Sequence, residues 1–285
     1  MIRALALACL CVVLCACSRP SADTTSEDSA QRVVTFAPNL AEIMFAVGAG
    51  ERLVGVSAWS DYPRAVLELP EIGDAFSIDQ EQLSLLQPDL LLVWESGMPE
   101  HTVDELRQRG YRVEAISTRN LDAVAEAMLR VGELTGQQTS AAVAARQFVD
   151  ELEALRATYE DAEPIDVFFQ ISARPLYTVN REHFISEIIG LCGGNNIFAD
   201  LDSFAPSVSV EAVIDRDPDV MLAAANAGDE AFDEWSRWPS LAADRYRNYF
   251  LLPETIGRGV PRLAMAARSL CTALDQARSN RGATQ

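Results

Sequence analysis

Lysine is absent from this 285-residue sequence, so all 23 of its basic side chains are arginines. The 42 acidic residues outnumber them and leave a formal net charge of −19 at pH 7. Nucleic acids and anionic lipid head groups would be repelled by so acidic a surface. We therefore expect no nucleic-acid partner.

Histidine is also scarce, occurring only as His101 and His183. A histidine-based zinc or manganese cluster needs more imidazoles, so we expect both to be surface side chains and no metal site, although oxygen-only coordination stays open. The sequence has no Gly-x-Ser-x-Gly motif and no glycine-rich phosphate loop that ends in lysine. These absences disfavour an enzyme and a bound cofactor.

The six cysteines are unevenly placed, and four of them fall within the first 17 residues: Cys9, Cys11, Cys15 and Cys17. Residues 4–13 form an apolar run that follows Arg3 and is too short for a permanent membrane helix. The next string, Leu-Cys-Ala-Cys, looks like a bacterial lipobox, in which the last cysteine is acylated. We expect residues 1–17 to be a lipoprotein signal peptide and Cys17 to be lipid-anchored. An ordinary secretory signal that is cut elsewhere is the alternative.

Residues 18–30 contain no large apolar side chain, so we expect residues 18–31 to form a flexible tether. A lipid anchor followed by a tether predicts a folded domain held on the periplasmic side of a bacterial membrane, and we expect this domain to be a monomer. The two remaining cysteines are Cys192 and Cys271. In an exported chain they favour one disulfide, with two buried free thiols as the alternative.

Short apolar runs rich in β-branched residues alternate with segments of helical apolar spacing through the rest of the chain. We expect strands at residues 33–36, 53–56, 90–94, 111–116, 167–171, 220–224 and 249–252. We expect helices at residues 40–47, 78–86, 103–109, 121–134, 183–191, 210–214 and 263–277. This alternation predicts an α/β fold with mainly parallel sheets.

One helix is expected to be much longer than the others, because residues 140–160 keep an apolar spacing without proline or glycine. A helix of about 20 residues spans about 30 Å, which is close to the width of a lobe. We therefore expect two similar lobes joined by one helix, with a ligand cleft between them. The predicted boundaries are residues 32–137, 138–162 and 163–279, followed by a tail at 280–285.

A similar device occurs in both halves of the chain: a short helix with a glutamate near its start, then a Pro-Asp turn into an apolar strand. Glu81 precedes the turn at residues 88–89, and Glu211 precedes the turn at residues 218–219. Pro-Asp is a common turn pair, so chance recurrence is the alternative. The matching flanks favour two related lobes.

Aromatic and polar residues follow several predicted strands, at residues 38–39, 59–63, 94–95 and 254–258. In open α/β sheets, ligands bind beyond the carboxyl ends of the strands. These positions are therefore candidates for a binding site, although a single tryptophan is more often part of a core.

Strings of residues along positions 32–274 resemble the cobalamin-binding receptors of bacterial ABC importers. The most specific are Ser-Asp-Tyr-Pro at residues 60–63, Cys-Gly-Gly at 192–194 and Leu-Cys at 270–271. The Pro-Asp-Leu string at residues 88–90 is shared across a wider class, the helical-backbone periplasmic binding proteins, which also serve iron-siderophore and haem uptake.

The resemblance implies a non-catalytic protein that binds cobalamin or a related corrinoid between rigidly spaced lobes. It implies that Tyr62 and Trp94 line the pocket, with Pro38 at its floor. It also implies that Glu254 and Arg258 lie near the ligand.

The resemblance further implies a disulfide between Cys192 and Cys271. It implies that Glu81 and Glu211 bind arginines on the two subunits of an ABC permease. Two exposed carboxylates at equivalent positions would suit a partner with two-fold symmetry. Complementary charges on the two proteins would fix how they align and would speed their association.

The chain departs from the family pattern at two cleft tryptophans. One falls near Ala75, with Phe76 beside it, and the other falls near Ala205. These losses leave room for a ferric siderophore or haem. For a siderophore, Arg174, Arg181 and Arg258 would be candidate ligand contacts. A surface enzyme or adhesion lipoprotein on an α/β scaffold is the remaining alternative.

Overall fold

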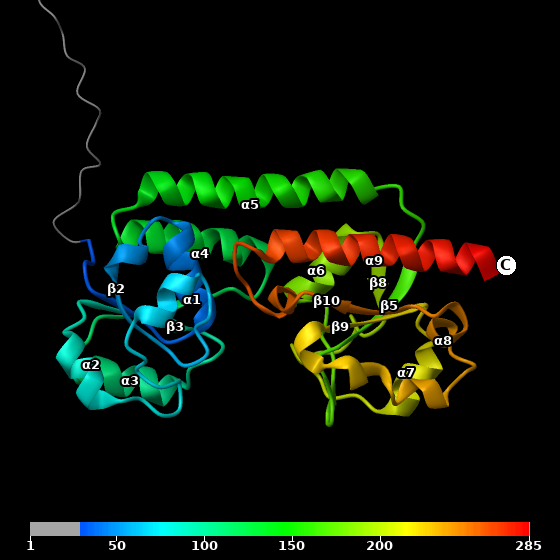
Figure 1. The fold of residues 1–285 in the computed structure, drawn as a ribbon, viewed down its shortest axis with the longest axis horizontal. Coiled ribbons are helices and arrows are strands. Elements are labelled where there is room, and N and C mark those ends of the chain that lie inside the picture. Colours follow the sequence, from blue (N-terminus) through cyan, green and yellow to red (C-terminus); the bar gives the residue numbers. More distant parts are fainter. Residues whose placement is uncertain (1–28, 285) are drawn as a thin grey trace, which may run out of the picture.

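The computed structural model describes residues 29–284 and forms two lobes side by side beneath two long helices (Figure 1). The predicted signal peptide, Cys17 and most of the predicted tether lie outside the described residues. Among residues 29–284, no helix is both long and apolar enough to cross a membrane.

The amino-terminal lobe is built on a four-stranded parallel sheet with strand order β2-β1-β3-β4. Its strands are β1 (Val33–Thr35), β2 (Leu53–Val56), β3 (Leu90–Trp94) and β4 (Val113–Ile116). Helices cover both faces of the sheet, namely α1 (Pro38–Ala46) and α4 (Leu121–Leu134) above it and α2 (Gln80–Leu86) and α3 (Glu100–Gln108) below it (Figure 1). Burial on both faces explains the continuous apolar run of β3.

The carboxy-terminal lobe repeats this plan with strand order β10-β9-β5-β8, again all parallel. Its strands are β5 (Ile165–Gln170), β8 (Gly194–Asn196), β9 (Val220–Ala224) and β10 (Tyr249–Leu252). Helices α6 (Phe184–Leu191) and α9 (Leu263–Thr284) lie above the sheet, α7 (Val210–Arg216) lies below it, and α8 (Ala242–Tyr246) lies beside it, in contact with both β9 and α9 (Figure 1). Taken in chain order, both sheets have the order second, first, third, fourth strand.

The sequence analysis missed three strands. β8 was missed because its Gly-Asn-Asn sequence carries turn-forming residues and has no apolar signal. The other two, β6 (Ser172–Ala173) and β7 (Leu176–Tyr177), form a small antiparallel pair. Short 3₁₀ segments complete the lobes: η1 (Gly50–Arg52), η2 (Arg64–Glu68), η3 (Ala225–Ala227), η4 (Asp229–Phe232), η5 (Trp235–Arg237) and η6 (Glu254–Gly257).

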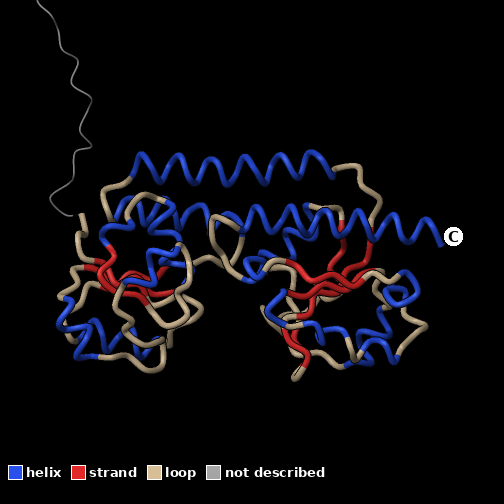
Figure 2. The backbone as a smooth tube through the Cα atoms, viewed as in Figure 1, coloured by secondary structure: helices blue, strands red, loops and turns tan. Residues whose placement is uncertain are grey.

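Helix α5 (Gln138–Tyr159) runs across the top of both lobes as the predicted connecting helix (Figures 1 and 2). Its buried side chains lie on one face: Ala141, Ala145, Phe148, Leu152 and Leu155. They join a single apolar core that extends through the upper layers of the two lobes, whereas the layer below each sheet has a separate core. The apolar core is therefore continuous between the two lobes along their upper side.

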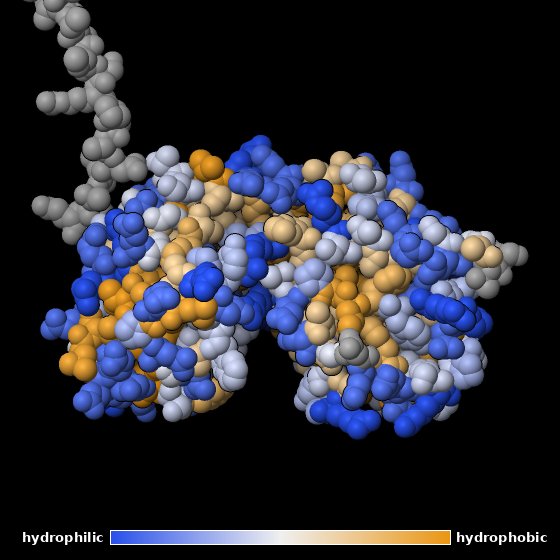
Figure 3. Space-filling view, viewed as in Figure 1, coloured by the Kyte–Doolittle hydropathy of each residue, from blue (hydrophilic) through white to orange (hydrophobic). Residues whose placement is uncertain are grey.

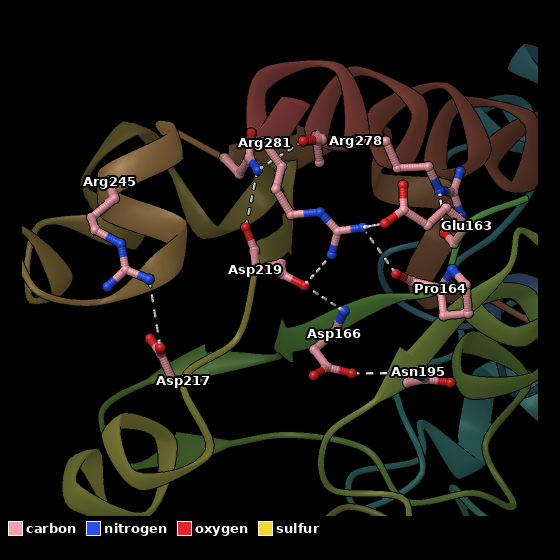
Figure 4. Close-up of polar contacts among 11 residues, drawn as sticks. Glu163, Pro164, Asp166, Asn195, Asp217, Asp219, Arg245, Arg278 and Arg281 are labelled. Carbon is pink, nitrogen blue, oxygen red and sulfur yellow. Dashed lines mark hydrogen bonds and ion pairs between the residues drawn. The ribbon is translucent and has the colours of Figure 1, made fainter. Parts of the chain in front are cut away.

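The upper layer of the carboxy-terminal lobe is also held by covalent and ionic bonds. Cys192, at the end of α6, forms the expected disulfide with Cys271 on α9. Near the end of α9, Arg281 binds Asp219 at 2.9 Å and Glu163 at 2.7 Å (Figure 4). Arg278 donates to the Glu163 carbonyl oxygen at 2.7 Å (Figure 4). These bonds fix α9 over the sheet for about two turns beyond residue 277, where the predicted helix ended.

Candidate ligand-binding cleft

The carboxyl ends of the strands in both sheets open toward the space between the lobes, which is visible as a deep notch in the surface (Figure 3). Pro38 follows β1 and Trp94 ends β3 in the amino-terminal lobe. In the other lobe, Ile171 follows β5, Asn226 lies beyond the end of β9 and Glu254 follows β10. Parallel topology thus brings loops from both lobes to a single cleft, as expected for ligand sites in open α/β sheets.

One cavity in this cleft, of about 180 Å³, is lined from both lobes and is mainly apolar. Pro38 and Trp94 contribute from the amino-terminal lobe, and Phe184 and Phe204 contribute from the carboxy-terminal lobe. The remaining lining residues are Ala37, Asn39, Ser96, Thr118, Arg119, His183, Gly257, Arg258 and Gly259. An apolar cavity with a few polar groups is the usual form of a small-molecule site.

Two further cavities adjoin the first through shared residues. One, of about 430 Å³, includes Asp61, Tyr62 and Arg262, and the other, of about 310 Å³, lies mostly on the carboxy-terminal lobe. Glu254 lines both of these, and Arg258 lines all three cavities. Arg258 therefore marks the point at which the three hollows meet.

The structure brings together five of the seven sequence-predicted ligand-binding residues around these cavities: Pro38, Tyr62, Trp94, Glu254 and Arg258. Ala75 and Phe76 line none of the three. Ala75 packs against the lower core of the amino-terminal lobe, and Phe76 is 83% exposed on the loop beyond β2.

Arginines at the cleft are paired with carboxylates from neighbouring elements. Arg258 donates to both carboxylate oxygens of Asp61, at 2.6 and 3.1 Å. These hydrogen bonds, together with the positive charge of the guanidinium, lower the pKa of Asp61. Arg119 lies 3.8 Å from Glu182. Each pair joins residues of opposite lobes, so it crosses the cleft and reduces the net positive charge that a ligand would meet.

A third pair between the lobes is buried. Arg262, just before α9, donates to both oxygens of Glu42 on α1, at 2.8 and 2.6 Å. The Glu42 side chain is only 4% exposed. The guanidinium of Arg262 also lies over the ring of Tyr62, 3.5 Å from its centre, in cation–π geometry. Tyr62 of the amino-terminal lobe therefore contacts the carboxy-terminal lobe.

Direct hydrogen bonds also link the lobes. The backbone N–H of Phe184 donates to the Arg119 carbonyl oxygen at 3.1 Å. The N–H of Leu121 donates to the carboxylate of Glu187 at 2.8 Å. Together with helix α5, these bonds connect the two lobes.

His183 corrects one sequence-based expectation, because its side chain is buried and not on the surface. Its ring lies 4.4 Å from the ring of Phe184 and is stacked at 4.5 Å on that of Phe204. Burial, reinforced by the positive charge of Arg119, lowers the pKa of His183 to about 4. A single histidine in a sequence carries no signal of this environment.

Phe204 is the other aromatic residue that the sequence analysis missed. It stands directly before Ala205, near which the family pattern places a tryptophan, and it lines the apolar cavity. The guanidinium of Arg119 lies 4.6 Å from the centre of its ring. Phe204 thus brings an aromatic ring to this side of the cavity.

The two glutamates predicted to dock a permease occupy matching places in the lobes. Glu81 lies in the first turn of α2, and Glu211 lies in the first turn of α7. Both are exposed, and both helices lie on the lower side of the molecule (Figure 1). Each helix begins at a side-chain cap, Asp79 or Ser209, as N-terminal capping favours. A hydrogen bond from its own backbone N–H, and then one from Ser209, lower the pKa of Glu211.

Comparison with known proteins places this fold and cleft in a family. A model of the periplasmic binding proteins matches residues 33–255. The vitamin B12-binding protein of Vibrio parahaemolyticus is 32% identical over 261 residues, which cover 90% of this chain and 94% of that protein. The chain belongs to the periplasmic binding protein family.

Solved structures of the family agree with the two-lobed fold. The periplasmic vitamin B12-binding protein BtuF of Vibrio cholerae superimposes with a TM-score of 0.78 at 33% identity, covering 87% of this chain and 98% of that one. The periplasmic heme-binding protein RhuT of Roseiflexus, in its apo form, gives a TM-score of 0.76 at 26% identity and covers 87% of this chain and 100% of that one. This periplasmic binding protein thus shares its architecture with relatives named for different ligands.

Proposed function

We propose that this protein binds cobalamin or a related corrinoid in the cleft between its lobes and delivers it, chemically unchanged, to an ABC importer. Relatives named as vitamin B12-binding proteins are similar over nearly their whole length, which supports the proposal. The single structural observation that carries it is the apolar cavity formed by Trp94, Phe184 and Phe204 from the two lobes. Aromatic side chains offer large flat surfaces to a macrocycle.

The charges of the cleft favour a ligand that is mostly neutral. The arginines that line the cavities are Arg119, Arg258 and Arg262, and each has a carboxylate partner. Glu254 adds a further negative charge to two of the cavities. An anionic ferric siderophore would have to displace those carboxylates, whereas the amide groups of a corrinoid can hydrogen-bond beside them.

Haem is the second candidate ligand, because the heme-binding protein RhuT has nearly the same fold. A siderophore receives less support than haem. Of the three arginines considered for it, Arg174 lines a separate hollow near η4, and Arg181 donates to the Ala199 carbonyl oxygen. Only Arg258 lines the cleft cavities, and it is engaged by Asp61.

Calorimetric titration of the mature protein with cyanocobalamin, hemin and ferric enterobactin tests this order. We expect cyanocobalamin to bind with a Kd below about 10 μM, which corresponds to about −7 kcal/mol and suits an uptake receptor. Tighter binding of hemin or of the siderophore than of cyanocobalamin would contradict the proposed ligand.

Docking on the two subunits of a permease through Glu81 and Glu211 is the second part of the proposal, with Cys17 as the lipid anchor. The matching places of the two glutamates on α2 and α7 support it. We expect Glu81→Arg combined with Glu211→Arg to abolish uptake in cells and to leave ligand affinity unchanged, because charge reversal would repel arginines on the permease. Unimpaired uptake by the double variant would exclude this role.

A further inference from the structure

The orientation of His183 is fixed by a hydrogen bond at the start of helix α6. His183 is the capping residue of this helix, and its Nδ1 accepts a hydrogen bond from the backbone N–H of Ile185 at 3.1 Å. The rings of Phe184 and Phe204 pack against the imidazole. The ring therefore has one defined position beside the cleft.

This hydrogen bond also decides which nitrogen carries the proton. A neutral imidazole has one N–H donor and one acceptor nitrogen. Because Nδ1 accepts from Ile185, the proton of the neutral ring is on Nε2. His183 lines both the 180 Å³ cavity and the 310 Å³ cavity, so Nε2–H is the polar group that the imidazole can offer to a ligand there.

We propose that His183 is a specificity-determining residue that donates a hydrogen bond from Nε2–H to a carbonyl oxygen on the rim of the ligand, and that it does not bind the metal of the ligand. A nitrogen that carries a proton has no free lone pair for a metal. This inference rests on the proposed corrinoid-binding function, because it names the ligand group that His183 recognises in the same cleft.

The charge state of His183 matches this role. Burial first, and then the charge of Arg119, lower its pKa to about 4, so the ring is neutral through the range of pH 5 to 8. Other charged groups around it are Glu182 and Glu187 on its own segment, and Glu254 and Arg258 from the region that follows β10. A neutral donor suits an amide oxygen, whereas a carboxylate such as a haem propionate would gain more from a cation.

Two substitutions separate the capping role of His183 from its proposed contact with the ligand. In His183→Asn, the side-chain oxygen can still cap α6, but the side chain is too short to place a donor where Nε2–H lies. In His183→Gln, the amide N–H₂ reaches the position of Nε2, but the cap is lost. We expect His183→Asn to unfold at the same temperature as wild type or higher, and His183→Gln to unfold at a lower one.

Calorimetric titration with cyanocobalamin tests the contact. We expect His183→Asn to weaken binding by about tenfold, as loss of one neutral hydrogen bond would, and His183→Gln to retain most of the affinity. Equal affinity of His183→Asn and wild type would overturn the inference. Failure of wild type itself to bind would overturn the proposed function, and with it this inference.

Spectroscopy tests the metal part of the inference. We expect the visible bands of aquocobalamin to keep their positions on binding to wild type, because His183 does not displace the water on cobalt. A band shift that His183→Asn abolishes would reveal axial ligation and would overturn the inference. Nitrogen NMR shifts of the ligand-free protein provide a ligand-independent check, with the proton on Nε2 as the expected result and a proton on Nδ1 as the contrary one.

Discussion

The two lobes have the same sheet topology and the same helix layers, yet they contribute different chemistry to the cleft. The amino-terminal lobe provides Trp94 as its aromatic residue, beside Pro38 and the cation Arg119. The carboxy-terminal lobe provides Phe204 together with His183 and Arg258, a neutral donor and a cation. The scaffold is therefore repeated, but the residues that line the cleft are not. A two-fold partner can meet equivalent surfaces on the lower side while an asymmetric ligand meets two different walls.

The lobes also differ in how they are stabilised. The disulfide joins two helices of the carboxy-terminal lobe, and the structure gives the amino-terminal lobe, as described from residue 29, no such bond. Contacts between the lobes include a shared upper core and ion pairs that differ strongly in burial. We therefore expect substitutions of these bonds to differ in how much unfolding free energy they cost.

The largest effect on stability is expected from Cys192→Ser combined with Cys271→Ser. The bond spans 79 residues, and the loss of so long a closed loop is expected to cost about 4 kcal/mol in unfolding free energy. Urea unfolding of oxidised wild type and the double variant measures the difference. A loss of less than ~1 kcal/mol would show that packing of α6 on α9 alone holds this layer.

A smaller effect is expected from Glu42→Gln. This change leaves Arg262 without its charged partner at a largely buried place, and we expect a loss of about 2–3 kcal/mol in urea unfolding. Asp61→Asn is the matched control, because it removes the other bidentate pair between the lobes at a site where the Asp61 side chain is 54% exposed. We expect it to cost less than about 1 kcal/mol. Equal losses would mean that burial does not set the strength of these pairs.

The pH dependence of the Asp61 pair follows from the direction of its pKa shift. Arg258 lowers the pKa of Asp61 below the ordinary value of 3.8, so the pair stabilises the folded protein at neutral pH and loses this contribution as the carboxylate is protonated at lower pH. We expect the stabilities of wild type and Asp61→Asn to converge as the pH falls below about 4. A constant difference over that range would contradict the assignment.

Ligand binding compares the two walls directly. We expect Trp94→Ala and Phe204→Ala each to weaken cyanocobalamin binding by about 1–3 kcal/mol, since each removes an aromatic contact from one side of the cavity. Phe76→Ala is the control, because Phe76 is exposed and lines none of the three cavities. If Trp94→Ala weakens cyanocobalamin binding and Phe204→Ala does not, the ligand contacts the amino-terminal wall alone.

Sequence patterns predicted the two-lobed fold well where a physical signal was strong. The apolar run of β3 and the proline-free spacing of α5 each specify one element, because burial on both faces or along one face is visible in the sequence. β8 was missed because its pairing with β5 is determined by tertiary contacts and not by its own Gly-Asn-Asn sequence. The same limit applies to those residues of the cleft that only tertiary contacts bring together.

Part of the site could be predicted because Pro38, Trp94 and Glu254 lie at or just beyond the carboxyl ends of strands, and these ends meet at one edge in a parallel sheet. His183 and Phe204 were missed because they are separated in sequence and come together only through the packing of α6 against a loop. Single residues of common types carry no pattern that would indicate such a contact.

The central claim, that the cleft holds a corrinoid between walls from both lobes, is tested most directly by a crystal structure of the mature protein with cyanocobalamin. The account predicts that the corrin ring lies between Trp94 and Phe204, with an amide oxygen within hydrogen-bonding distance of His183 Nε2. Density for the ligand outside the cleft, or an empty cleft at saturating cyanocobalamin, would contradict it.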